Sequence, residues 1–212
     1  MDYKDSFSGS KFELVQSNKN IYIKKFYKII GNRDLKSFEK QNNFKSYFVK
    51  KYQIKSAKIT KINIIKKLIT LKYYSGLSGT ELILNSDIEI HKILNIFLEE
   101  YVKNLIATSE YEKFNARPYI VKCHEVKKKI SSKHMFLFKK MYKKIFSKLS
   151  SIQINLKGSC HGDLTLSNII INSKKKKIIL IDFLKTYKES PLQDVCKLIQ
   201  DLRLYWTSRK LN

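Results

Sequence analysis

The chain contains the sequence CHGDLTLSN at residues 160–168, followed by IILIDF at residues 178–183. In these two stretches, Asp163, Asn168 and Asp182 stand beside short apolar runs. Phosphoryl transfer requires an acceptor that orients a hydroxyl nucleophile, and oxygen ligands that hold Mg²⁺ against the phosphates of a nucleotide. The two aspartates and the asparagine supply these groups, so the sequence predicts a phosphoryl-transfer site.

The segment between Asn168 and Asp182 predicts a β-hairpin, because two apolar runs, 169–171 and 178–181, enclose a polar turn. The two ends of a hairpin lie next to each other, so we expect Asn168 and Asp182 to be neighbours in the folded protein. An amide and a carboxylate are hard oxygen donors, which suit Mg²⁺ and do not hold zinc selectively.

The composition is that of a folded protein. The 212 residues are 43% hydrophobic and 12% aromatic, which excludes wholesale disorder and allows one sizeable core or two small lobes. No apolar run approaches the length of a membrane span, and the first residues do not resemble a secretory signal. The three cysteines lack CxxC spacing, which argues against a disulfide framework or a zinc knuckle. We therefore expect a cytoplasmic protein.

The formal net charge of +25 has two interpretations. It could indicate a binder of nucleic acid or of an anionic membrane surface. However, only four of the 43 basic residues are arginine, and a chain rich in Lys, Ile, Asn, Tyr and Phe is also typical of an A/T-rich coding genome. We expect no specific nucleic-acid binding, whereas peripheral contact with a membrane surface stays open.

Periodicity predicts a sheet with one helix in the first part of the chain and mainly helices in the second. The Gly- and Ser-containing stretch 75–80 is the expected boundary, giving lobes at 1–74 and 75–212. Asp194 is expected to cap the last helix. Strands are expected at 12–15, 21–27, 57–62 and 68–74, and helices at 32–48, 86–105, 134–149 and 192–204, with no clear pattern at 110–132. Two of these helices carry an apolar face that is expected to lie in the core: Ile90, Leu94, Phe97, Leu98, Tyr101 and Leu105 on the first, and Phe138, Met141, Ile145 and Leu149 on the second.

The pattern HGD, four residues, N, followed by IDF resembles the catalytic and metal-binding segments of aminoglycoside phosphotransferases and choline/ethanolamine kinases. The resemblance implies an α+β, two-lobed protein-kinase-like fold, with a small antiparallel sheet lobe that binds ATP and a mainly helical catalytic lobe. It implies that Asp163 is the catalytic base, that Asn168 and Asp182 bind Mg²⁺, and that His161 braces the loop. The chain also looks like compact bacterial members found in surface-polysaccharide pathways.

The segment Asn20–Lys24 is similar to the third strand of this family, whose lysine holds the nucleotide phosphates. Tyr22 and Lys24 share one face of a strand, and an aromatic ring there could stack on adenine. This argument favours Lys24 over Lys25 as the nucleotide lysine. Glu39, on the following helix, is the expected partner that fixes it.

Two further segments are assigned by the same resemblance. A hinge between the lobes would bind the adenine edge through its backbone, and a corner of small residues near the start of the chain would approach a phosphate. The hinge residues are Lys72, Tyr73 and Tyr74, and the corner residues are Ser8, Gly9 and Ser10.

The acceptor is expected to be a small molecule with a hydroxyl group. Only eleven residues separate Asp182 from Asp194, which is too few for a long segment that would dock a peptide. An amino alcohol, a sugar and an aminoglycoside all remain candidates. A metallophosphoesterase is disfavoured because the remaining histidines are scattered. The alternatives that stay open are a catalytically weak nucleotide-binding pseudokinase that acts as a scaffold, and a basic nucleic-acid or membrane-surface binder.

Overall fold

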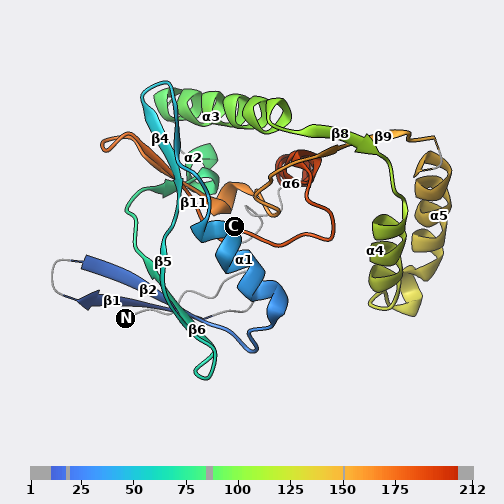
Figure 1. Ribbon diagram of the computed structural model, residues 1–212, viewed down its shortest axis with the longest axis horizontal. Coiled ribbons are helices and arrows are strands. Elements are labelled where there is room, and N and C mark those ends of the chain that lie inside the picture. Colours follow the sequence, from blue (N-terminus) through green and yellow to red (C-terminus); the bar gives the residue numbers. More distant parts are fainter. Residues whose placement is uncertain (1–10, 18–19, 85–87, 150, 205–212) are drawn as a thin grey trace.

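The computed structural model describes residues 11–17, 20–84, 88–149 and 151–204 (Figure 1). The expected phosphate corner, Ser8, Gly9 and Ser10, lies outside the described residues. The architecture is α+β, with an antiparallel sheet near the start of the chain and helices packed around a second sheet. The expected fold class is therefore confirmed.

The first sheet is antiparallel and has the strand order β1-β2-β6-β5. Its strands are β1 (Lys11–Ser17), β2 (Asn20–Phe26), β5 (Ile59–Asn63) and β6 (Leu68–Lys72). Helix α1 (Asn32–Asn42) begins after Gly31, whose N–H donates to Asp34 Oδ2 at 2.8 Å. A small core forms where Phe38 of α1 meets Ile59, Ile69 and Leu71. This core fixes α1 to the sheet.

The second sheet has the order β3-β4-β11-β10-β7 and carries the predicted hairpin. The hairpin strands are β10 (Ile169–Asn172) and β11 (Lys177–Leu180), with Ile169 opposite Leu180. The N–H of Ile181 donates to the carbonyl of Asn168 at 3.1 Å, so the hairpin ends adjoin as expected. The other strands are β3 (Tyr47–Val49), β4 (Tyr52–Ser56), which is parallel to β11, and β7 (Leu77–Ser78).

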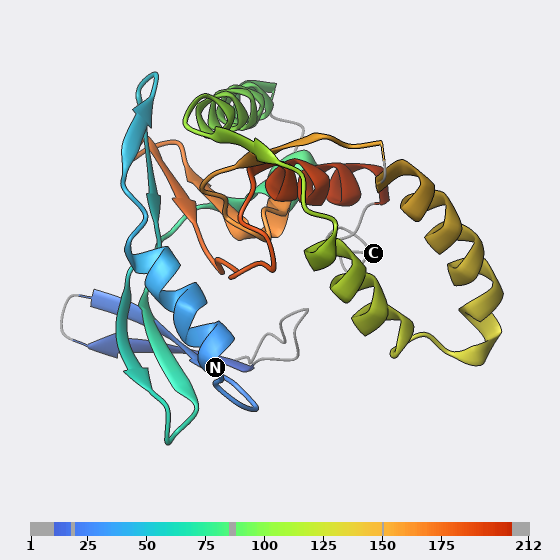
Figure 2. The same ribbon diagram turned by 45° about the vertical axis from the view of Figure 1, so that its right-hand side comes forward.

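The helical part packs on this second sheet. Helices α2 (Gly79–Leu84), α3 (Ile88–Ala107) and α6 (Pro191–Leu204) flank the 3₁₀ turn η1 (Leu166–Asn168). The apolar face predicted for α3 is confirmed at four positions, since Leu94, Phe97, Tyr101 and Leu105 are buried. Strands β8 (Glu110–Lys113) and β9 (Ile154–Lys157) lead to an arm of two helices, α4 (Arg117–Lys127) and α5 (Ser132–Leu149), which projects from the rest (Figures 1 and 2).

One expectation about the secondary structure was wrong, and several elements were not predicted. The helix predicted to reach Phe48 ends at Asn42, because the β-favouring residues after it form β3 and β4. Strands β8 and β9 were not predicted. The sequence shows no clear pattern at 110–132, whereas the structure has α4 in this segment. Pro118 lies in the first turn of α4, where a missing N–H breaks no helical hydrogen bond.

The core stripe predicted for α5 was also wrong. Met141 is 54% exposed and Ile145 is 41% exposed. The α5 residue that faces α4 is Tyr142, whose hydroxyl lies 3.1 Å from His124 Nε2 and whose ring lies 4.4 Å from Phe146. Helix α5 has few neighbours in the arm, so much of its apolar surface stays uncovered.

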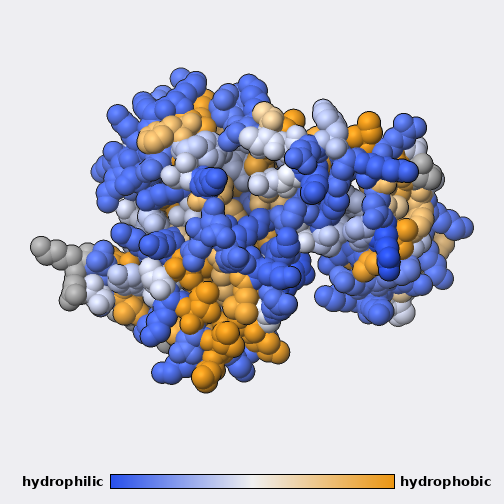
Figure 3. All heavy atoms as spheres, viewed as in Figure 1, coloured by the Kyte–Doolittle hydropathy of each residue, from blue (hydrophilic) through white to orange (hydrophobic). Residues whose placement is uncertain are grey.

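The surface shown in Figure 3 is largely hydrophilic, with apolar side chains gathered below α1 over the β5–β6 region. At the turn between these strands, Ile64 is 54% exposed and Ile65 is 93% exposed. No helix within the described part of the chain is both long and apolar enough to cross a membrane. The expected lobe boundary after residue 74 follows β6 directly and stays a prediction.

Candidate functional site

Side chains of helix α6 form hydrogen bonds with the loop that carries Asp163. Asp194 is fully buried, and its carboxylate accepts the N–H groups of His161 and Gly162 at 2.6 and 2.7 Å. Burial raises the pKa of Asp194, while the hydrogen bonds from the backbone N–H groups of His161 and Gly162 act against this rise. About two turns further along α6, the carboxylate of Asp201 accepts the N–H of Leu166 at 2.7 Å. The expectation that Asp194 caps its own helix missed these bonds to a distant loop.

His161 connects this loop to the segment that carries Asp182. Its Nε2 lies 2.7 Å from the carbonyl of Ile181, and its Nδ1 accepts the N–H of Asp163 at 3.3 Å. The ring is completely buried against Phe183, and this burial lowers the pKa of His161. A carbonyl can only accept and an N–H can only donate, so the two bonds fit an imidazole with its proton on Nε2 and a bare Nδ1. These contacts support a bracing role for His161.

Gly162 permits the tight approach of the two segments. Its φ is +92°, which favours glycine, and a Cβ at this position would clash with the carbonyl oxygen of Leu184. The N–H of Leu184 in turn donates to the carbonyl of His161 at 3.0 Å. A side chain at position 162 would therefore separate the two segments.

Asp163, Asn168 and Asp182 converge at the end of the hairpin. The Nδ2 of Asn168 donates to the carbonyl of Asp163 at 2.8 Å, which directs the amide oxygen away from that bond. Asp182 has a φ of +58°, an uncommon conformation for a residue other than glycine and one that often occurs at functional sites. Carboxylate and amide oxygens are the ligands that Mg²⁺ prefers, so these side chains fit that ion.

Lys25, rather than Lys24, faces this site. Its Nζ lies 2.7 Å from Oδ2 of Asp182, and its side chain is only 6% exposed. It also lies over the rings of Phe12 and Tyr27, at 5.4 Å from each ring centre. Burial and the charge of Asp182 raise the pKa of Tyr27, so its hydroxyl stays neutral beside the lysine.

The preference for Lys24 therefore does not match the geometry. Tyr22 and Lys24 do share a face of β2, as the alternation requires, but Lys25 is the buried residue and is directed at Asp182. Lys24 instead lies 3.5 Å from Glu13 of β1. Strand alternation predicts which residues share a face of β2, but it does not predict which of the two faces is covered.

Glu39 is also directed away from the site. The face of α1 that meets the Asp182 segment carries Ser37 and Gln41, which are buried, whereas Glu39 is exposed on the other side. A separation of two residues corresponds to about 200° around a helix, which accounts for the opposite directions. The carboxylate that pairs with Lys25 is that of Asp182, and the expected pairing with Glu39 is not what the structure shows.

A stripe of polar side chains on helix α1 forms hydrogen bonds with the backbone that follows Asp182. Gln41 Oε1 accepts the N–H of Phe183 at 3.2 Å, and Ser37 Oγ accepts the N–H of Lys185 at 2.7 Å. Arg33 Nε donates to the carbonyl of Lys185 at 2.9 Å. Sequence reasoning missed this stripe, although the spacing of four residues between its members was a usable signal.

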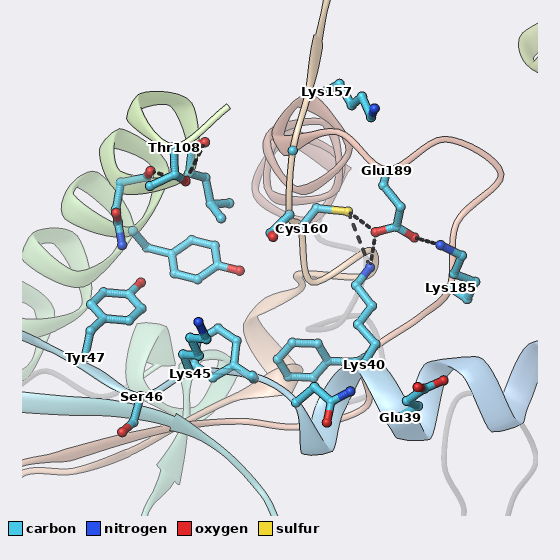
Figure 4. A pocket seen from close by; sticks show the side chains of 18 of the residues that line it. Glu39, Lys40, Lys45, Ser46, Tyr47, Thr108, Lys157, Cys160, Lys185 and Glu189 are labelled. Atoms are coloured by element: carbon cyan, nitrogen blue, oxygen red, sulfur yellow. Dashed lines mark hydrogen bonds and ion pairs between the residues drawn. The ribbon is translucent and has the colours of Figure 1, made fainter. Parts of the chain in front are cut away.

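A groove of about 950 Å³ lies on the side of α1 that carries Glu39 and Lys40 (Figure 4). Lys40 Nζ lies 2.6 Å from Glu189 and 3.5 Å from the thiol of Cys160. Burial alone would raise the pKa of Glu189, but Lys40, Cys160 and a backbone N–H outweigh it and lower the pKa to about 2. These bonds tie α1 to the loop before α6.

The expected hinge lies beside a second, smaller cavity. Tyr73 donates its N–H to the carbonyl of Ile21 at 3.0 Å, which joins the end of β6 to β2. Lys55 lies over the Tyr74 ring at 4.8 Å. Lys72, Tyr73 and Tyr74 line this cavity of about 370 Å³, and their contact with adenine stays a prediction.

Lys197 is a site residue that the sequence did not suggest. It lies on α6 between Asp194 and Asp201, and its Nζ is 2.8 Å from Oδ1 of Asp163. The spacing of three and four residues puts all three side chains on one helix face, toward the same loop. In a chain with so many lysines, only the folded arrangement singles this one out.

Comparisons with known proteins identify the family and the fold. The ecdysteroid kinase-like family matches residues 85–201, which is more than half of the chain. No curated protein sequence matches. The structure of choline kinase LicA from Streptococcus pneumoniae is similar, with a TM-score of 0.58 and 14% identity, over 96% of this chain and 70% of that chain.

Two aminoglycoside phosphotransferase structures are also similar. APH(2″)-IIa in complex with gentamicin has a TM-score of 0.55 and 16% identity, over 91% of this chain and 67% of that chain. ADP-bound APH(2″)-Ib has a TM-score of 0.52 and 16% identity, over 91% of this chain and 68% of that chain. Together these likenesses establish the protein-kinase-like fold, and the chain belongs to the ecdysteroid kinase-like family.

Proposed function

We propose that the protein is an ATP-dependent phosphotransferase that moves the γ-phosphoryl group to a hydroxyl group of a small molecule. The observation that carries the proposal is the convergence of Asp163, Asn168 and the Lys25–Asp182 pair at one end of the β10–β11 hairpin. The names of the similar proteins, a choline kinase and aminoglycoside phosphotransferases, favour a small-molecule acceptor.

Each residue has a chemical role in this proposal. Asp163 accepts the proton of the acceptor hydroxyl as the oxygen of that hydroxyl bonds to the γ-phosphorus and the bond to ADP breaks. Asn168 and Asp182 would hold Mg²⁺, which supplies positive charge to the phosphates when bound. Lys25 adds a buried cation beside Asp182. Its place makes it the proposed phosphate ligand instead of Lys24.

The surrounding residues keep these groups in position. His161 and Asp194 hold the backbone of the Asp163 loop, and the α1 stripe holds the segment after Asp182. Residues 1–74 are proposed as the nucleotide-binding lobe and 75–212 as the catalytic lobe. Since ATP is the proposed donor, we propose a cytoplasmic location.

A pseudokinase is the second candidate, and one observation favours it. Both aspartates are paired with a lysine, Asp163 with Lys197 and Asp182 with Lys25, and a protein that only binds nucleotide has no need for a free base. Such a protein would bind ATP without transferring phosphate. Transfer is the property that separates the two candidates.

The test is a transfer assay with the full chain, γ-labelled ATP and Mg²⁺, against amino alcohols, sugars, sugar acids and aminoglycosides. We expect label to appear in at least one acceptor, and to be lost when Asp163→Asn replaces the base. Lys197 pairs with this aspartate, so the variant must be shown to stay folded by circular dichroism. ATP binding without labelled product in any class would instead support the pseudokinase.

A further inference from the structure

Lys197 places a positive charge directly beside the proposed catalytic base. Its Nζ lies 2.8 Å from Oδ1 of Asp163, and the two side chains are 29% and 34% exposed. Because the lysine bonds to Oδ1, the second oxygen of Asp163 is the one left for an acceptor hydroxyl. A hydroxyl bonded there would lie about 5 Å from the ammonium group, given an ordinary hydrogen-bond length.

This pairing changes which acceptors the site attracts. A lone aspartate would draw a cationic amino alcohol toward its charge, whereas the Asp163–Lys197 pair is neutral as a whole. The charges around the pair then decide, and the chain carries a net charge of +25. A cation next to the reacting hydroxyl would therefore meet repulsion that nothing at the pair offsets.

The neighbouring carboxylates in the described residues do not supply that offset. Glu189 is paired with Lys40 and Lys185, and Glu112 is paired with Lys188. The carboxylate of Asp194 already accepts hydrogen bonds from the backbone N–H groups of His161 and Gly162. These three carboxylates are thus already engaged by lysines or by backbone N–H groups.

We infer that the acceptor carries an anionic group, a carboxylate or a phosphate, next to the hydroxyl that Asp163 activates. Lys197 is the residue that selects this class against cationic amino alcohols and amino sugars. The inference rests on the proposed phosphotransferase function. It narrows the acceptor classes that the sequence left open, since it disfavours both aminoglycosides and choline-like compounds for this chain.

The experiment uses compounds that share a hydroxyl and differ in charge. Glycolate and ethanolamine form a two-carbon pair, and glucuronate, glucose and glucosamine form a series on one sugar ring. The measured quantity is the rate of ATP turnover by the full chain as the concentration of each compound is raised. A compound can act as an acceptor of the phosphoryl group, or it can compete with water for the transfer. We expect each anion to act at a concentration about tenfold lower than its cationic counterpart.

Variants of α6 connect this preference to Lys197. Lys197→Met should abolish the preference for anions, and Lys197→Arg should retain it. Arg203→Gln is the matched control, because it removes one positive charge from an exposed position on the same helix. It should leave the preference unchanged.

The outcomes separate this inference from the function on which it rests. Turnover that prefers the cationic compounds, or a preference for anions that survives in Lys197→Met, would overturn the inference and leave the phosphotransferase intact. A complete lack of ATP turnover, with every compound and with water, would overturn the proposed function and the inference with it.

Discussion

Nζ of Lys25 lies 2.7 Å from Oδ2 of Asp182, so a strand of the first sheet is joined directly to the segment after the β10–β11 hairpin. The two residues are 157 positions apart in the chain. This pair links the sheet expected to hold nucleotide to the loop expected to hold metal, whereas the neighbouring Lys24 lies 3.5 Å from Glu13.

We predict that Lys25→Met lowers kcat/KM for ATP by about 100-fold, because it removes a buried cation from the proposed phosphate site. The matched variant Lys24→Met should change kcat/KM by no more than about threefold, since Lys24 makes only a partly exposed ion pair with Glu13. Steady-state kinetics at varied ATP measure both. Equal losses in the two variants would contradict the assignment.

Asp194→Asn should destabilise the fold, even though the two side chains have the same shape. The amide can offer only one oxygen to the N–H groups of His161 and Gly162, so one of these buried donors would face an NH₂ group. The expected loss is about 2 kcal/mol in the free energy of unfolding, measured by urea denaturation. Glu125→Gln breaks only an exposed ion pair with Lys122 and is the control. Its unfolding curve should match that of the unaltered chain.

The Lys40–Glu189 pair predicts acid sensitivity. The pKa of Glu189 is about 2 in the folded protein against an ordinary value of 4.5. Between these two pH values the unfolded chain binds a proton that the folded chain does not, so the free energy of unfolding falls as the pH falls. Lys40→Met should flatten this slope, measured as urea denaturation between pH 5 and 3. Lys36→Met, which alters the same groove at an exposed position, should not.

The thiols of Cys160 and Cys196 should differ in reactivity toward iodoacetamide. Burial raises the pKa of Cys160 to about 11, although Lys40 acts to lower it, so the thiol stays protonated at neutral pH. Cys196 is exposed on α6. Mass spectrometry after brief alkylation at pH 8 should find Cys196 modified and Cys160 unmodified. Faster modification of Cys160 would mean that the loop before Asp163 opens readily.

The sequence predicted those parts of the site that depend on local spacing. The hairpin and the adjacency of Asn168 to the Asp182 segment follow from two apolar runs and a short turn, and the structure has both. The family resemblance and the fold were also predicted correctly. The residues that carry these features lie within about twenty consecutive positions, so the features can be recognised in one sequence.

What the sequence did not predict depends on contacts between distant segments. The choice between Lys24 and Lys25 needs the direction of a strand face relative to Asp182, and periodicity supplies only the alternation. Glu39 is acidic and lies on the expected helix, but it is exposed, whereas Ser37 and Gln41 are buried on the face of α1 that meets the Asp182 segment. Lys197 became visible only when α6 was packed beneath the Asp163 loop.

The central claim is that Asp163 performs the transfer whereas Asp182 helps to hold the nucleotide with Mg²⁺. The most direct measurement is calorimetric binding of ATP with and without Mg²⁺, together with phosphoryl transfer, for Asp163→Asn and Asp182→Asn. We predict that Asp163→Asn binds ATP with Mg²⁺ as the unaltered chain does and transfers no phosphate, while Asp182→Asn loses the part of binding that depends on Mg²⁺. Full transfer by Asp163→Asn, or Mg²⁺-dependent binding that is unchanged in Asp182→Asn, would contradict the account.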